Sequence, residues 1–261
     1  MDKIANLLEH LQARMRERGL TSTSSSGREH KYQCPDCQDR GIILNDDGTA
    51  QICHCQEQKR LERLFKSSQI TPAFRGKTFD NFITVGRPPA VRAMYDCAKD
   101  YADRFHELRG QENNWLVLLG EPGSGKTHLS MAVANRLLSQ GITVLYFQHV
   151  EGLGELKDAL ARQGEARITT KLEQMKKATL LVWDDLFWGK GYPKDFELEV
   201  AFEVLNYRYL NLLPTIISSN RTHLQLLEIN DTIGSRIIER GKGHMVVVQG
   251  REANYRLAGE G

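Results

Sequence analysis

Residues 120 to 127 read Gly-Glu-Pro-Gly-Ser-Gly-Lys-Thr and match the phosphate-loop pattern G-x-x-x-x-G-K-[ST]. An apolar run, 115–119, precedes the motif, and a helix-like run, 128–139, follows it. Glycine lacks Cβ, so the backbone can turn its N–H groups toward phosphate oxygens, and the helix that follows adds unpaired N-terminal donors. A glycine-rich turn with a chance lysine is the alternative, but the full motif and both flanks favour a nucleoside triphosphate site.

The last two residues of the motif supply charge and a metal ligand. Lys126 can place its ammonium group on the β- and γ-phosphates. The Thr127 hydroxyl can join the oxygen ligands of Mg²⁺, an ion that keeps several of its waters in such sites. The motif therefore predicts binding of a triphosphate together with Mg²⁺.

A second motif stands at the end of a later strand. Residues 179–183 lead into Asp184 and Asp185, the Walker B arrangement, because the carboxyl end of such a strand opens beside the phosphate loop. Asp184 would hold the waters of Mg²⁺, and Asp185 would orient or deprotonate the attacking water. Asn220 ends the strand predicted at 213–220 and could bind that water and sense the γ-phosphate, or simply cap the strand end. The predicted nucleotide ligands are Gly120, Glu121, Pro122, Gly123, Ser124, Gly125, Lys126, Thr127, His128 and Asp184, with Thr127 and Asp184 also serving Mg²⁺.

Four of the five cysteines lie close together in the chain, at Cys34, Cys37, Cys53 and Cys55. Thiolates at these spacings can form a tetrahedral Zn²⁺ site when a short hairpin, predicted over residues 41–52, brings the second pair to the first. Two alternatives remain open: His54 replaces Cys53 or Cys55 as a ligand, or the thiols are buried and free. A small module of this kind has little core, so Zn²⁺ would supply much of its folding free energy.

The motifs need a set of elements to position them. From residue 115 onward, strands and helices alternate as in nucleotide-binding α/β proteins, which predicts a parallel sheet. The expected strands are 115–119, 143–147, 179–183, 213–220 and 245–249, and the expected helices are 91–108, 126–139, two pieces within 150–177, 195–210 and 233–240.

The N-terminal part of the chain has a different character. An amphipathic helix is expected over residues 1–20, a flexible linker rich in serine and threonine over 21–30, and the zinc module with a connecting helix over 31–67. The ATPase domain would occupy 68–261. The apolar face of the first helix could fold back on its own chain or dock on another protein.

Composition narrows the class of protein. The 261 residues are 40% hydrophobic and 26% charged, with a formal net charge of +2, which is typical of a globular protein and does not by itself indicate nucleic acid binding. The apolar runs fall short of a membrane span, and the N-terminus does not resemble a signal peptide. We expect a cytoplasmic protein with no membrane partner.

Taken in order, the phosphate loop, Asp184-Asp185, Ser219-Asn220, residues 234–240 and Asn254-Tyr255-Arg256 resemble the DnaC/DnaI-type bacterial replicative helicase loaders. These proteins are related to the IstB-type transposition helper ATPases. The likeness covers about residues 70–256, and the cysteine module resembles the zinc-bearing N-terminal region of the DnaI-like branch. The resemblance implies an AAA+ ATPase of the initiator and loader clade.

The resemblance also implies partners and further site residues. It predicts ATP bound between subunits that associate through those sites, a replicative ring helicase bound by the N-terminal region, and single-stranded DNA. Arg236 would be the arginine finger that reaches the neighbouring subunit's γ-phosphate, with Arg240 as the alternative. Region 150–177 occupies the place of the clade's DNA-lining insertion, so its basic residues become candidate phosphate contacts or a solvated charged face: Lys157, Arg162, Arg167 and Lys171.

The sequence departs from the family pattern at two points, and two other functions compete with that of a helicase loader. Asp185 stands where many AAA+ proteins carry glutamate, which predicts slow or partner-dependent hydrolysis. We identify no arginine in a C-terminal helical lid, so we expect a single α/β ATPase domain. A transposition helper ATPase acting with a transposase on DNA is the main alternative. A metabolic kinase is disfavoured by the pattern of Asn220 and Arg236.

Overall fold

A computed structural model describes residues 32–45, 49–163, 165–189 and 191–257. The chain divides into two compact units, residues 1–55 and 56–261. The amphipathic helix and the linker predicted at 1–20 and 21–30 lie outside the described residues. Within the described ranges, every helix is too short or too polar to cross a membrane.

The larger unit is built on a five-stranded sheet, counted over the described residues, in the order β4-β5-β6-β3-β7. All neighbouring pairs of its strands are parallel. Because parallel strands end on one edge, this order brings the ends of β3, β5 and β6 next to one another. The strands are β3 (Leu116–Gly120), β4 (Val144–Gln148), β5 (Leu180–Asp184), β6 (Thr215–Ser219) and β7 (Met245–Val248).

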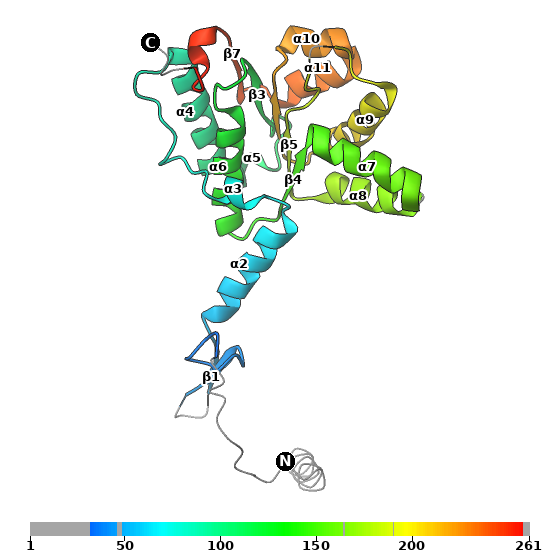
Figure 1. Ribbon diagram of the computed structural model, residues 1–261. Coiled ribbons are helices and arrows are strands. Elements are labelled where there is room, and N and C mark those ends of the chain that lie inside the picture. Colours follow the sequence, from blue (N-terminus) through cyan, green and yellow to red (C-terminus); the bar gives the residue numbers. More distant parts are fainter. Residues whose placement is uncertain (1–31, 46–48, 164, 190, 258–261) are drawn as a thin grey trace. The chain divides into compact units, whose positions relative to one another are not determined.

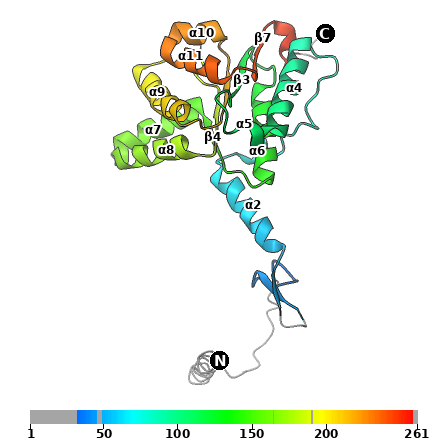
Figure 2. The same cartoon turned by 180° about the vertical axis from the view of Figure 1, so that it is seen from behind.

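Helices cover both faces of this sheet (Figures 1 and 2). One face packs against α4 (Pro89–Asp103) and α6 (Lys126–Ser139), and the other against the group that runs from α7 to α11. The remaining helices are α2 (Cys55–Ser67), α3 (Pro72–Arg75), α5 (Phe105–Leu108), α7 (His149–Gln163), α8 (Glu165–Lys177), α9 (Asp195–Leu210), α10 (His223–Ile229), α11 (Asp231–Arg240) and the 3₁₀ turn η1 (Arg251–Ala253).

Successive side chains of a strand point to opposite faces of the sheet, which explains why there is a core on each face. In β3, Leu116 and Leu118 enter the core beneath α4 and α6, whereas Val117 and Leu119 enter the opposite core. All four side chains are fully buried. A central parallel strand that is covered on both faces reads as a continuous apolar run, which is why the sequence 115–119 is apolar throughout.

The edge strand β4 is joined by a segment that precedes the sheet in sequence. The backbone N–H of Tyr146 donates to the carbonyl of Ser68 at 2.8 Å. The segment that contains Ser68 and Phe74 thereby lies against the middle of β4, at the edge of the sheet. This contact occupies backbone groups that an uncovered edge strand would leave unpaired.

The smaller unit contains a short antiparallel hairpin. Strand β1 (Ile42–Leu44) pairs with β2 (Ala50–Ile52), and Ile42 lies opposite Ile52. The N–H of Cys53 donates to the carbonyl of Gly41 at 2.9 Å, which extends the pairing by one step toward the cysteines. The hairpin therefore brings Cys53 and Cys55 back to Cys34 and Cys37.

Within the described residues, the predicted strands and helices agree with the structure in type and order, but the short elements α3, α10 and η1 were not predicted and one predicted helix is divided. The helix expected at 91–108 is two helices, because the chain leaves α-helical geometry at Arg104, where φ is −101° and ψ is 10°. The α/β fold with a parallel sheet is confirmed.

Candidate nucleotide-binding site and cysteine cluster

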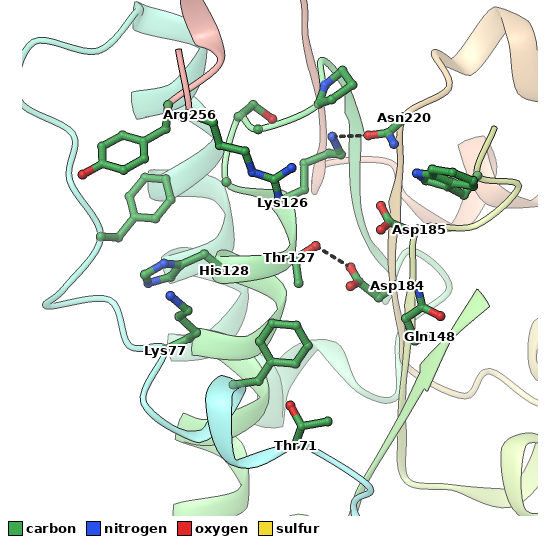
Figure 3. A pocket seen from close by; sticks show the side chains of 18 of the residues that line it. Thr71, Lys77, Lys126, Thr127, His128, Gln148, Asp184, Asp185, Asn220 and Arg256 are labelled. Carbon is green, nitrogen blue, oxygen red and sulfur yellow. Dashed lines mark hydrogen bonds between the residues drawn. The ribbon is translucent and has the colours of Figure 1, made fainter. Parts of the chain in front are cut away.

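A cavity of about 800 Å³ opens where the carboxyl ends of the strands meet the phosphate loop. Its walls come from four places: residues 122–128, the ends of β4, β5 and β6, the segment 71–87, and the residues after η1 (Figure 3). Segments from both ends of the larger unit thus contribute to one site. A cavity of this size suits a nucleotide-sized ligand.

Lys126 is the central cation of the site. Its Nζ donates to the carbonyls of Gly120 and Glu121 and to Asn220 Oδ1, each at 2.9 Å (Figure 3). Burial lowers the pKa of Lys126 to about 8, although the charges of Asp185 and Asp184 act in the opposite direction. A buried ammonium whose hydrogen-bond partners are all oxygen acceptors is well suited to receive phosphate oxygens.

The glycines of the loop are required by close packing as well as by backbone geometry. Gly123 and Gly125 have φ values of 74° and 105°. A Cβ on Gly123 would lie 1.9 Å from Asn254 Oδ1, and a Cβ on Gly125 would lie 2.5 Å from the Phe82 ring. The phosphate loop is therefore held between a segment before the sheet and a segment after it.

Asp184 is buried at the end of β5 and accepts three hydroxyl donors. Thr127 Oγ1 donates to its Oδ1 at 3.0 Å (Figure 3). Ser218 Oγ also donates to Oδ1, and the Tyr146 hydroxyl donates to Oδ2 at 3.2 Å. Burial raises the pKa of Asp184, whereas these hydrogen bonds act to lower it. The Thr127 hydroxyl and the Asp184 carboxylate together form an oxygen donor set of the kind that Mg²⁺ prefers, so the residues fit that ion.

Asp185 follows at the start of a tightly held loop. Its φ is 55°, in the left-handed region that non-glycine residues seldom adopt, and Phe187 repeats this with a φ of 53°. The Asp185 N–H donates to Ser218 Oγ at 3.0 Å, and the Leu186 N–H donates to the Ser218 carbonyl at 2.8 Å. Burial, and then the charge of Asp184, raise the pKa of Asp185. Such a carboxylate is a stronger base than an exposed aspartate.

Arg221, directly after Asn220, donates hydrogen bonds to the loop that begins at Asp185. Its Nε donates to the carbonyl of Phe187 at 3.1 Å, and its Nη2 donates to the carbonyl of Gly191 at 2.6 Å. Residues from the end of β6 therefore contact both Lys126 and the loop that begins at Asp185. Arg221 belongs to none of the motifs that the sequence contains.

The residues after η1 bring Arg256 to the site. No motif of a C-terminal lid indicated this arginine. Arg256 lines the cavity, and its side chain lies beside Lys126 (Figure 3). The segment is anchored by the Tyr255 N–H, which donates to the Gly123 carbonyl at 2.9 Å. The Tyr255 ring stacks on Arg87 at 5.1 Å from its guanidinium carbon. The triplet Asn254-Tyr255-Arg256 was the available signal, but its position in the site depends on the path of the chain.

His128 lies in the wall of the cavity, next to the predicted loop. Its Nε2 is 2.9 Å from the carbonyl of Thr78, and its ring meets Phe82 edge-on at 5.1 Å. Burial lowers the pKa of His128, so the neutral ring is favoured. Segment 71–87, for which no motif indicated a role in the site, thus forms part of the site wall.

Arg236 and Arg240 occupy different environments on α11. The Arg236 guanidinium carbon lies 5.3 Å from the ring centres of both Phe202 and Tyr209, and the side chain is half-buried. Arg240 is buried and donates to the carbonyls of Glu112 and Tyr209. Among the described residues, neither arginine lines the cavity of its own chain. Arg240 is committed to internal packing, which leaves Arg236 as the one nearer the surface.

Two of the four basic residues singled out in the insertion have acidic partners. Lys157 lies 3.7 Å from Glu197, and Lys171 pairs with Glu155. The side chains of Arg162 and Arg167 are outside the described part of the chain. The described lysines therefore belong to ion pairs within the fold.

The four predicted zinc ligands meet in the smaller unit. The sulfurs of Cys34, Cys37, Cys53 and Cys55 all lie within 4.8 Å of one another and are buried. Cys34 and Cys53 sulfurs are 3.7 Å apart, and Cys37 and Cys55 sulfurs are 3.4 Å apart. Four sulfurs about 2.3 Å from a central Zn²⁺ would be about 3.8 Å from one another, so the cluster fits that ion.

Contacts within the cluster act unequally on its thiols: the hydrogen bond with Cys37 raises the pKa of Cys55 to about 12, whereas the pKa of Cys37 is lowered. The Gly41 N–H donates to Cys37 Sγ at 3.3 Å. Although burial opposes ionisation, this amide and the neighbouring thiols lower the pKa of Cys37 to about 7. The His54 side chain is mostly exposed, and its Nδ1 lies 3.5 Å from Asp36 Oδ2. The geometry favours the four cysteines over a set that includes His54.

Comparison with known proteins gives consistent results. The family described as IstB-like ATP binding protein matches residues 105–260. The phage-like element PBSX protein XkdC of Bacillus subtilis (strain 168) is 36% identical over 265 residues, covering 98% of this chain and 97% of that protein. The replicative helicase loader DnaI of the same organism is 28% identical over 193 residues, covering 70% of this chain and 60% of its own length.

A solved structure extends the likeness to three dimensions. The crystal structure of DnaI superposes with a TM-score of 0.53 at 23% identity, covering 71% of this chain and 94% of the other. At this identity the match establishes the fold alone. The chain therefore belongs to the IstB-like ATP-binding protein family and is a relative of the DnaC/DnaI-type helicase loaders.

Proposed function

We propose that this protein is an ATP-driven loader that binds a replicative ring helicase and places it on single-stranded DNA. The observation that carries the ATPase part is the pair of contacts Lys126–Asn220 and Thr127–Asp184, each between residues far apart in sequence. They join the phosphate loop to the ends of β5 and β6 around one cavity. The helicase part is supported by the likeness to DnaI and DnaC.

Hydrolysis would use groups that the site brings together. Lys126 and Arg256 offer positive charge to the phosphates, and Asn220 Oδ1 is placed to accept a hydrogen bond from water near Lys126. Asp185, with its raised pKa, would take a proton from the attacking water. Mg²⁺, held by Thr127 and Asp184, would supply charge neutralisation at the phosphate oxygens.

Arg236 would act on the ATP of a neighbouring subunit. It lies away from the cavity of its own chain and is the less buried of the two candidate arginines. An arginine supplied in trans stabilises the charge that develops on the transferred phosphoryl group. Such a site makes ATP turnover depend on self-association.

The N-terminal unit would recognise the helicase in the cytoplasm. Its cysteine cluster fits Zn²⁺ and would hold the hairpin in one conformation. A folded small module can present a fixed surface to a partner at low entropic cost. DNA would be engaged by the ATPase domain.

Co-purification with the replicative helicase of the same host tests this proposal. We expect complex formation by the full chain, stimulated by ATP, and loss of the complex when residues 1–67 are deleted. Binding of fluorescent ATP should survive that deletion, which separates a lost helicase surface from a misfolded ATPase domain. Helicase binding that is retained without residues 1–67 would contradict the assignment of the partner surface, and absence of any complex would contradict the loader function.

A transposition helper ATPase is the second candidate, because the matching family carries the IstB description. Such a protein would act with a transposase on duplex DNA. Purifying the chain with the helicase and, separately, with a transposase encoded near its gene distinguishes the two. Selective binding of the transposase would favour the helper.

A further inference from the structure

Tyr146 lines the nucleotide site but belongs to neither the phosphate loop nor the Asp184-Asp185 motif. It lies on β4, where it pairs with Val182, while Gln148 pairs with Asp184. Side chains two residues apart on a strand point to the same face, so Tyr146 and Asp184 share a face as diagonal neighbours. The Tyr146 hydroxyl is 3.2 Å from Asp184 Oδ2, and Tyr146 lines the cavity.

The Tyr146 ring is fixed from outside the sheet. The backbone of the same residue is bonded to Ser68, and the Phe74 ring meets the tyrosine ring edge-on at 5.8 Å. The side chain is only 5% exposed. A tyrosine confined in this way has little freedom to move its hydroxyl away from the carboxylate.

The donors divide unequally between the two oxygens of Asp184. Oδ1 accepts from Thr127 and Ser218, whereas Oδ2 accepts from Tyr146. Among the hydrogen bonds of the described residues, the Tyr146 hydroxyl is the donor to Oδ2, so it constrains the orientation of the carboxylate plane from the side opposite Oδ1. We propose that Tyr146 is a positioning residue that orients Asp184 toward the Mg²⁺ of the bound nucleotide.

This inference rests on the proposed nucleotide function and makes it more specific. Loss of the hydroxyl would leave Oδ2 without its buried donor and let the carboxylate rotate away from the orientation that suits the metal. The phosphate loop and Lys126 are not bonded to Tyr146, so metal-free nucleotide binding should be preserved. A defect that appears only in the metal dependence is therefore the signature of a positioning role.

The test compares wild type with Tyr146→Phe, which keeps the ring and removes only the hydroxyl. Fluorescent ATP is first titrated in EDTA, and Mg²⁺ or Mn²⁺ is then titrated into the protein–ATP complex, with Mn²⁺ binding followed by electron paramagnetic resonance. We expect equal affinity in EDTA and about tenfold weaker metal binding in the variant, the effect of one lost hydrogen bond to a charged group.

Tyr101→Phe is the matched control. The Tyr101 hydroxyl donates to the Asn114 carbonyl at 2.7 Å in a fully buried position, and Tyr101 does not line the cavity. A metal affinity for Tyr146→Phe equal to that of wild type, or an equal loss in both variants, would overturn the inference. Failure of wild type to bind ATP at all would instead contradict the proposed function.

Discussion

Lys126 combines a buried position with a full set of oxygen acceptors. Three acceptors lie within hydrogen-bonding distance of its Nζ, yet burial still lowers its pKa to about 8. At pH 8 a large fraction of the nucleotide-free protein therefore carries a neutral Lys126. Triphosphate oxygens favour the charged form, so binding should shift this pKa upward.

We therefore predict that ATP binding takes up protons near pH 8 and much less below pH 7, where Lys126 is already charged. Isothermal titration calorimetry in two buffers of different ionisation enthalpy measures this uptake directly. It should approach about half a proton per ATP at pH 8. Lys126→Arg is the control, because a guanidinium stays charged across this range. Equal proton uptake by the two proteins would contradict the assignment.

Some residues of the site could be predicted from the sequence and others could not. Lys126, Thr127 and Asp184 could be predicted, because phosphate and metal chemistry restrict which residue types stand at fixed spacings. Tyr146 and Arg256 could not, since each reaches the site through strand register or through the path of the chain after the last strand. A pattern read along the sequence contains no such information.

Among the elements, α8, α9 and β6 are joined by one arginine. Arg208 is fully buried on α9. Its guanidinium donates at 2.9 Å to the carbonyls of Met175, Lys176 and Ala178 and to the Thr215 hydroxyl, and it also reaches the Pro214 carbonyl. The last carbonyls of a helix lack partners within that helix, so Arg208 satisfies the end of α8.

Replacing Arg208 by methionine should lower the free energy of unfolding by about 3–5 kcal/mol, because several buried carbonyls would lose their donor at once. Chemical denaturation measures the change. The control is Arg136→Met, which removes a half-exposed ion pair with Asp103 and should cost about 1 kcal/mol or less. Similar losses in both variants would show that Arg208 does not join these elements.

Most elements could be predicted from periodicity, and the exceptions have physical causes. The strands were predicted because central strands covered on both faces must be apolar, as residues 180–183 are. Helix α10 (His223–Ile229) went unpredicted: its seven residues are too short for a periodic signal, and its start is fixed by a capping box between Thr222 and Gln225. The apolar pattern continues across Arg104 to the buried Phe105, so the sequence carries no signal for the break there.

At the scale of the whole molecule, the two compact units should respond separately to metal removal. We predict that a strong zinc chelator abolishes hydrogen-exchange protection in residues 32–55, because the described part of this unit has little core besides its cysteines. ATP affinity should change by less than about twofold, since the cavity is lined by the other unit. Equal loss of exchange protection and of ATP binding would contradict independent units.

Assembly gives the second prediction at this scale. Arg236→Ala should leave ATP affinity nearly unchanged but reduce turnover of the assembled protein by about 10³-fold, the effect of removing an arginine supplied in trans. Steady-state ATPase assays over a range of protein concentrations measure this. Arg92→Ala, which removes an exposed pair with Asp96 on α4, is the control. Turnover equal to wild type would exclude Arg236 as the finger.

The close approach of Asn254 to Gly123 and of Phe82 to Gly125 affects how genetic screens should be interpreted. Any side chain introduced at either glycine would displace a neighbouring segment as well as disturb the phosphate loop. Loss-of-function alleles at these two glycines would therefore mix defective folding with defective catalysis. Lys126→Met, which removes the positive charge and leaves both glycines in place, is the cleaner allele for deciding whether a cell needs this protein to bind ATP.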